Sequence, residues 1–232
     1  MNRWTPRKRD AHSAVQVPWA EEPPPTAPWR AEVAWSLLPC PGEFVSGDRA
    51  IVQHFADVLH VAVVDVAGHG RHAAQVAEDL DQHMRRQGDL PAASWLYAAH
   101  QRLIGSQGAV AAVLRLDLRR GIGEMAAVGN VRSGWFAGKP HHHEPNSGQL
   151  GVTMPRVEAR PLHWTISQLF ALTSDGVRSE GWNALQREWP VLSCDALAAR
   201  TTRLYQRRHD DATAICVRVV QDDLFGGAHA GG

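Results

Sequence analysis

The sequence predicts an α+β fold in which layers of β-sheet and helix pack on one another. Short β-branched and apolar runs, separated by turn residues, come in groups that are typical of neighbouring antiparallel strands. Segments with apolar residues at three-to-four spacing lie between these groups and indicate amphipathic helices. Because groups of strands alternate with groups of helices, the pattern favours separate layers over regular βαβ units.

The chain is long enough for one domain with flexible ends. It has 232 residues, of which 44% are hydrophobic, so it can bury one sizeable core. Residues 1–30 hold six of the fourteen prolines and show no helical or strand periodicity, which predicts a flexible arm. We expect the folded domain at residues 31–221 and a flexible glycine-rich tail at residues 222–232.

The charge balance excludes some classes of partner. Lys and Arg together number 24, as do Asp and Glu, so no summed field favours nucleic acid or an anionic membrane. No apolar run approaches the roughly 20 residues that span a bilayer, and no apolar segment of a secretory signal follows the N-terminus. Three cysteines without a CxxC pairing favour reduced thiols. We therefore expect a soluble, cytoplasmic protein.

The first half of the domain predicts three strands followed by two helices. The runs EVAWSLL, AIVQHFA and VLHVAVVDV, at residues 32–38, 50–56 and 58–66, are β-branched and apolar. Residues 70–87 and 91–104 then repeat apolar side chains at helical spacing.

The second half predicts a strand meander, a further strand, a helix and a last strand. The meander comprises residues 109–118, 122–131 and 133–138, with glycines at its turns. A strand at 165–176, a helix at 195–207 and a strand at 212–220 follow. His141, His142 and His143 lie among prolines and glycine, so we expect a solvated loop there, because consecutive side chains diverge and cannot easily share one metal ion.

Aspartates stand where several predicted strands begin or end. Asp65 ends a buried strand before a glycine-containing turn, Asp175 follows the strand LFALT, and Asp210 precedes the final strand. One such aspartate is usually a turn former or helix cap. Carboxylates that converge from different strands repel unless cations neutralise them, and hard divalent cations prefer oxygen ligands. The arrangement therefore predicts a metal site, with a pair of ions.

Five ordered motifs carry a resemblance to a known family. They are PGEFVSGD (41–48), DVAGHGRHAAQVA (65–77), VGN (128–130), LTSDGVRS (172–179) and HDDATAICV (209–217). This ordered set resembles the metal-dependent PPM-type (type 2C) protein phosphatases, in the branch of the stage II sporulation protein E phosphatase. Within that branch the chain looks similar to the stand-alone phosphatases that regulate sigma factors and the stressosome in stress responses.

The resemblance implies a four-layer α-β-β-α sandwich of two antiparallel sheets flanked by helices. It also implies two divalent cations, Mn²⁺ or Mg²⁺, at one end of the sandwich. Asp65 would bridge both ions, Asp48 and the backbone carbonyl of Val66 would bind one, and Asp175 and Asp210 the other. Asp211 would not be a ligand, because the first acidic residue of this pair is the usual one in the family.

The resemblance further implies protein serine/threonine phosphatase activity, with attack on phosphorus by a water that bridges the two cations. The expected substrate is a phosphorylated regulatory protein, either an anti-sigma antagonist of the STAS type or a stressosome component. Asn130, Arg132 and Arg178 are the candidates for substrate contacts, although a turn role is equally open for Asn130. Ala67 stands where animal enzymes have a histidine, so His69 is interpreted as a turn residue or a neighbour of the ligands.

Two other functions stay open on sequence grounds. The first is a catalytically silent phosphatase fold that sequesters a partner in a partner-switching pathway, against which the four retained aspartates argue. The second is an ATP-binding fold of the histidine-kinase type, suggested by the glycine-containing turn in DVAGHG, which alone is weak evidence.

Overall fold

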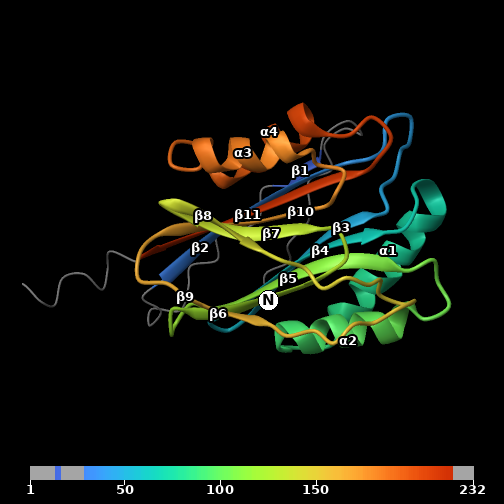
Figure 1. Ribbon diagram of the computed structural model, residues 1–232, viewed down its shortest axis with the longest axis horizontal. Coiled ribbons are helices and arrows are strands. Elements are labelled where there is room, and N and C mark those ends of the chain that lie inside the picture. Colours follow the sequence, from blue (N-terminus) through green and yellow to red (C-terminus); the bar gives the residue numbers. More distant parts are fainter. Residues whose placement is uncertain (1–13, 17–28, 222–232) are drawn as a thin grey trace, which may run out of the picture.

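The computed structural model describes residues 14–16 and 29–221. Within them, every paired strand runs antiparallel to its neighbours, and the strands form two sheets (Figure 1). The six-stranded sheet has the spatial order β1 (Ala14–Gln16), β2 (Trp29–Leu38), β11 (Ala212–Gln221), β10 (Gln168–Thr173), β7 (Arg132–Ala137) and β8 (Lys139–His143). The five-stranded sheet has the order β3 (Asp48–Phe55), β4 (Val58–Val66), β5 (Ala109–Asp117), β6 (Ile122–Val128) and β9 (Arg160–His163).

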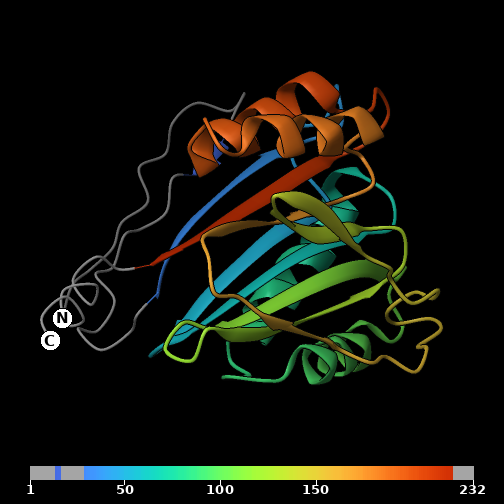
Figure 2. The same ribbon diagram turned by 60° about the vertical axis from the view of Figure 1, so that its left-hand side comes forward.

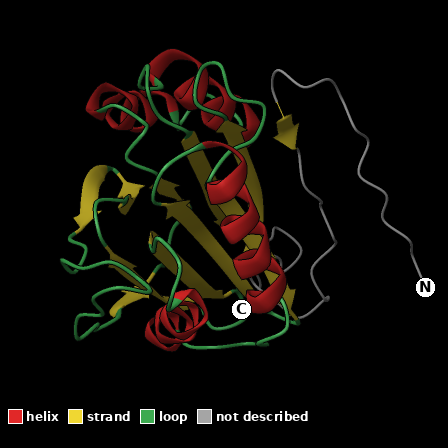
Figure 3. Cartoon of the chain, turned by 90° about the vertical axis from the view of Figure 1, so that its right-hand side faces the viewer, coloured by secondary structure: helices red, strands yellow, loops and turns green. Residues whose placement is uncertain are grey.

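Helices cover the outer face of each sheet. Helices α1 (Gly70–Met84) and α2 (Ala92–Leu103) pack on the five-stranded sheet, and α3 (Ser179–Glu188) and α4 (Cys194–Tyr205) lie over the six-stranded sheet. Figure 2 shows these layers in order, and Figure 3 shows the strands lying between the helices. The predicted four-layer α-β-β-α sandwich is therefore confirmed. No helix in the described ranges is long and apolar enough to cross a membrane.

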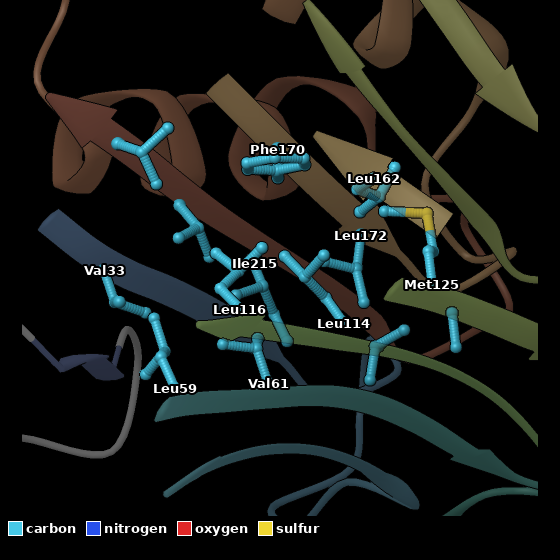
Figure 4. Close-up of a cluster of buried hydrophobic side chains, with 14 of the residues drawn as sticks. Val33, Leu59, Val61, Leu114, Leu116, Met125, Leu162, Phe170, Leu172 and Ile215 are labelled. Atoms are coloured by element: carbon cyan, nitrogen blue, oxygen red, sulfur yellow. The ribbon is translucent and has the colours of Figure 1, made fainter. Parts of the chain in front are cut away.

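The main core lies between the two sheets. Strand β4 illustrates its construction, because alternate side chains of a strand point to opposite faces. Its Leu59, Val61 and Val63 face the other sheet, while Ala62 and Val64 face α1 and α2. A strand covered on both faces is apolar throughout, which explains the near-continuous hydrophobic run. Figure 4 shows side chains from both sheets meeting in this layer.

The structure differs from the sequence prediction at several elements. His141, His142 and His143 are not in a loop but in β8, an edge strand paired with β7, and the His143 side chain is buried. Helix α3 and strand β9 were not predicted. Trp29 already belongs to β2.

The predicted flexible ends fall mostly outside the described residues. Residues 1–13 and 17–28 of the predicted arm, and the predicted tail at 222–232, are not described. Between them, Ala14–Gln16 form β1 and pair with β2. The division of the chain into arm, domain and tail stays a prediction.

Candidate active site

Asp48 and Asp65 lie opposite each other on the five-stranded sheet. Asp48 begins β3, Asp65 lies near the end of β4, and the two are direct partners in the antiparallel ladder. Strand alternation places Asp65 on the same face as Val61 and Val63, which is the face toward the other sheet. Directly opposed residues bring their Cβ atoms to about 5 Å, so the two carboxylates are neighbours.

Asp175 and Asp210 approach from the six-stranded sheet. Asp175 follows β10 and Asp210 precedes β11, and these two strands pair with each other. Gly176 allows the close approach, because a Cβ added there would lie 1.7 Å from the carbonyl oxygen of Asp211. The Asp175 carboxyl group raises the pKa of both Asp210 and Asp65, so it lies close to each of them. The structure therefore brings together aspartates from both sheets.

Asp211 fixes the loop that leads into Asp48. One carboxylate oxygen accepts the backbone N–H of Cys40, and the other accepts that of Gly47, each at 2.7 Å. Figure 1 shows the loop before β3 (blue) and the loop before β11 (red) side by side at the right-hand end. Both carboxylate oxygens of Asp211 already accept hydrogen bonds from backbone N–H groups. This supports Asp210 rather than Asp211 as the cation ligand.

Gly47 brings the loop before β3 close to the turn after β4. A Cβ at Gly47 would lie 2.8 Å from the Cβ of Ala73 in α1 and 3.3 Å from the backbone carbonyl oxygen of Val66. The Val66 N–H donates to the Gly47 carbonyl at 3.3 Å. The absence of a side chain at Gly47 thus lets the backbone just before Asp48 lie close to the Val66 carbonyl, which the sequence analysis predicted as a cation ligand.

The four carboxyl groups interact unfavourably when all are ionised. Burial, together with the charges of Asp48, Asp175 and Asp210, raises the pKa of Asp65 to about 10. The pKa of Asp48 is raised to about 8, because burial and the charges of Asp211 and Asp210 outweigh the opposing hydrogen bond with Ser174. Burial and the neighbouring Asp175 raise the pKa of Asp210 to about 6. At neutral pH, either protons or cations must therefore neutralise part of this cluster.

The residues present fit divalent cations. Asp48 is buried, and its Oδ2 atom has no hydrogen-bond partner within the described residues. Such an atom is costly unless a partner supplies positive charge or a donor. As the side chains stand, no group of three or more His, Cys, Asp or Glu residues in the described chain is arranged to hold a metal ion, so the carboxylates would have to reorient on binding one. The donor chemistry, oxygen from carboxylates and a backbone carbonyl, suits Mg²⁺ or Mn²⁺.

The histidine in the turn before α1 pairs with a glutamate. His69 is exposed, and its Nδ1 lies 3.1 Å from Oε1 of Glu43. Gly70 follows with φ +77°, and a Cβ there would lie 3.2 Å from the same carboxylate. These contacts are those of a turn residue.

The three proposed substrate contacts lie in different places. Asn130 donates from Nδ2 to Oδ2 of Asp175. Arg132 donates from Nη1 to the Val177 carbonyl at 3.4 Å, and both Asn130 and Arg132 line a pocket of about 360 Å³. Arg178 donates to the Leu204 carbonyl at 2.8 Å and does not line this pocket. The structure thus brings Asn130 and Arg132, but not Arg178, to the pocket beside Asp175.

Sequence reasoning missed the residues that hold the proposed ligands in place. The Arg207 side chain donates from Nε to the Asp175 carbonyl at 2.8 Å, and the backbone N–H of Arg207 donates to the Gly176 carbonyl at 2.8 Å. Ser174 accepts the N–H of Thr213 at 2.9 Å and also contacts Asp48. Ser174 lies inside the LTSDG motif and was open to prediction, whereas Arg207 lies in no motif.

Comparisons with known proteins agree with this geometry. The family model described as "Stage II sporulation protein E (SpoIIE)" matches residues 56–220. A chain from a structure described as the bacterial stressosome, "a modular system that has been adapted to control secondary messenger signaling", is 29% identical, with a TM-score of 0.75; the match covers 82% of this chain and 100% of that one. No curated protein matches the chain.

Two further solved structures share the fold at lower identity. RsbX in complex with magnesium is 19% identical, with a TM-score of 0.75, and the match covers 88% of this chain and 99% of RsbX. A structure of the phosphatase domain of SpoIIE from Bacillus subtilis, with a fragment of its regulatory domain, is 17% identical, with a TM-score of 0.71. That match covers 85% of this chain and 65% of the other.

Proposed function

The chain belongs to the SpoIIE family of PPM-type phosphatases, and on that basis we propose that it is a metal-dependent protein phosphatase acting on phosphoserine and phosphothreonine. The observation that carries this proposal is the meeting of Asp48 and Asp65 from one sheet with Asp175 and Asp210 from the other. Their raised pKa values and the unpaired Oδ2 of Asp48 support a site built to receive positive charge.

Each proposed ligand has a distinct place in the site. Asp65 interacts with Asp48 on its own sheet and with Asp175 from the other, so it is the residue suited to bridge two cations. Asp48 and the Val66 carbonyl would hold one cation, and Asp175 and Asp210 the other. Bound divalent cations supply an activated water for attack on phosphorus and offset the charge that develops on the phosphoryl oxygens.

The surrounding residues orient these ligands. Asp211 fixes the backbone at Cys40 and Gly47 and so sets the position at which β3 begins. Arg207 fixes the backbone of Asp175, and Asn130 donates to the Asp175 carboxylate. Fixed ligands need little rearrangement during the reaction, which is how preorganised sites lower a barrier.

We further propose that the substrate is a phosphorylated regulatory protein, a STAS-type anti-sigma antagonist or a stressosome component. The similarity at 29% identity to a chain from a stressosome structure supports this choice. The RsbX structure with magnesium supports a divalent cation as cofactor, and the two sheets, each contributing aspartates, support two ions. A purified STAS-domain protein carrying phosphoserine is the direct probe, with release of inorganic phosphate as the readout.

The test of the proposed function is manganese-dependent hydrolysis of p-nitrophenyl phosphate. We expect activity in the wild type with Mn²⁺, none with a chelator, and a loss of about 100-fold or more in Asp65→Asn. Asp79→Asn, an exposed change on α1, is the matched control and should keep wild-type activity. Wild-type rates in metal-replete Asp65→Asn would falsify the site assignment, and no hydrolysis by the manganese-loaded wild type would favour a silent binding module.

A further inference from the structure

A pocket of about 360 Å³ lies at the open end of the β7–β8 hairpin, against the start of α3. Its wall includes Arg132 and Ser133 from β7, His143 from β8 and Asn183 from α3. The volume falls within the range of about 300–1,000 Å³ typical of ligand pockets. Of the five phosphatase motifs, only VGN, through Asn130, and LTSDGVRS, through Ser179, contribute residues to this pocket.

The pocket adjoins the candidate active site through one side chain. Asn130 lines the pocket and also donates from Nδ2 to Oδ2 of Asp175. Ser179, four residues after Asp175, lines the pocket as well. A substrate whose phosphate lies among the aspartates therefore has its flanking residues within reach of this pocket.

The pocket holds a partly buried positive charge. Arg132 is half-buried and donates one long hydrogen bond, to the Val177 carbonyl. It forms no ion pair with an acidic side chain of the described chain. Glu144 also lines the pocket, but it is exposed. Because water and salt screen an exposed charge more strongly than a half-buried one, Arg132 dominates the selectivity of the pocket.

The wall also carries buried polar atoms with unused hydrogen-bonding capacity. Ser133 and His143 are direct partners in the β7–β8 ladder, with exposed fractions of 2% and 8%. Neither Ser133 Oγ nor His143 Nε2 has a hydrogen-bond partner within the described residues, and the same holds for Nε1 of Trp182 across the pocket. Because consecutive side chains of a strand point to opposite faces, Ser133 and His143 lie on the face toward the core between the sheets, whereas Arg132 and Trp182 lie on the α3 side. The unpaired Nε1 of Trp182 is therefore the polar atom of this set that lies on the same side of the sheet as Arg132.

We propose that this pocket binds the residues of the substrate protein that flank its phosphorylated side chain, and that Arg132 selects an acidic residue among them. The inference rests on the proposed function. The sequence analysis predicted both Arg132 and Arg178 as substrate contacts, but the two now have different roles. Arg132 lines the pocket, whereas Arg178 donates a hydrogen bond to the carbonyl of Leu204. The segment of the substrate protein next to its phosphorylated residue is the occupant that links this pocket to the aspartates.

The test measures kcat/KM for synthetic peptides with a central phosphoserine and alanines on both sides. A series then carries one aspartate at each flanking position in turn. In the wild type we expect an aspartate in at least one position to raise kcat/KM by about fivefold, as a partly exposed ion pair allows. Arg132→Gln should reduce this preference to less than about twofold, because a neutral side chain no longer favours a carboxylate over a methyl group.

Two further variants separate binding from folding. Gln186→Ala is the control for Arg132→Gln, because Gln186 is exposed on α3, the helix that lines the pocket, but lies outside the pocket itself. This variant should keep the acidic preference. Ser133→Ala, whose side chain faces the core between the sheets, should leave the acidic preference unchanged, while the urea unfolding midpoint stays unchanged or rises, since an unpaired buried hydroxyl does not stabilise the fold.

The possible failures point to different proposals. Hydrolysis of p-nitrophenyl phosphate without any acidic preference in the wild type overturns the pocket assignment alone. An acidic preference that persists in Arg132→Gln also overturns it. No hydrolysis of any substrate by the manganese-loaded wild type overturns the proposed function and this inference together.

Discussion

Asp210 and Asp211 are adjacent aspartates with opposite expected effects on stability. The carboxylate of Asp211 is buried and accepts two backbone N–H groups, from Cys40 and Gly47, at 2.7 Å each. Asp210 accepts neither of these donors, and its pKa is raised to about 6 by burial and by its neighbour Asp175. In the absence of cations, the Asp211 carboxylate stabilises the fold and the Asp210 carboxylate destabilises it.

The cost of Asp211→Asn follows from those two hydrogen bonds. A hydrogen bond to a charged acceptor contributes about 1.5–3 kcal/mol, and a buried N–H left without a partner loses a comparable amount. Asparagine has the same shape but keeps one acceptor oxygen, and its amide group faces the other donor. Removing the charge also relieves the repulsion that Asp211 exerts on Asp48. The loss of a hydrogen bond outweighs this relief, so we expect a decrease of about 2 kcal/mol in the free energy of unfolding.

The assay is urea unfolding of both variants with a chelator present, so that cation binding does not contribute. Asp210→Asn is the matched control, because it makes the same chemical change one residue away. It should keep or slightly raise the metal-free stability, since it removes a repelling carboxylate, while it weakens Mn²⁺ binding in calorimetry. Equal destabilisation by the two changes, or none by Asp211→Asn, would refute the assignment of Asp211 as the residue that fixes this loop.

Three further predictions concern the same framework. Without metal, the stability of Asp65→Asn relative to the wild type should rise by up to about 1.4 kcal/mol per pH unit between pH 5 and 8. The reason is that the pKa of Asp65 is higher in the folded than in the unfolded protein, so the wild type loses stability as the pH rises above the unfolded pKa. A stability difference that does not depend on pH would contradict this. Gly176→Ala should lower the urea midpoint by the equivalent of about 3 kcal/mol or more, since its Cβ would lie 1.7 Å from a carbonyl oxygen. Asp89→Asn weakens a partly exposed ion pair with Arg115 and should cost about 1 kcal/mol, which a double-mutant cycle with Arg115→Gln can check.

The sequence predicted the strands that carry the site better than the strands at the sheet edges. Strand β4 could be predicted because its residues are apolar on both faces and form a hydrophobic run, which Asp65 interrupts near its end. Strand β8 contains a proline and three histidines, and β9 contains Pro161, so neither has a strand pattern. Both lie at the edge of a sheet, where proline is tolerated and pairing with one neighbour suffices. Their pairing therefore depends on tertiary contacts that no local pattern encodes.

The same distinction holds within the site. The positions of Asp65, Asp175 and Asp210 at strand ends follow from the hydrophobic pattern, whereas Asp48 was added through the family resemblance. The role of Asp211 could not, because it depends on contacts with Cys40 and Gly47, more than 160 residues away in the sequence. The difference between Arg132 and Arg178 was equally out of reach, since both are arginines near a motif and only packing places one in the pocket.

The rigidity of the two sheets explains how the protein tolerates a cluster of repelling carboxylates. Asp48 and Asp65 continue strands whose inward side chains, such as Val61 and Val63, are fully buried between the sheets. Moving either aspartate away from its neighbours would disturb that packing, at a cost of about 2 kcal/mol or more for each large side chain exposed. Raised pKa values are the less costly response, because a proton neutralises a carboxyl group without moving the backbone. The core would therefore keep the proposed ligands in place without cations, so that binding of cations would require loss of protons rather than refolding.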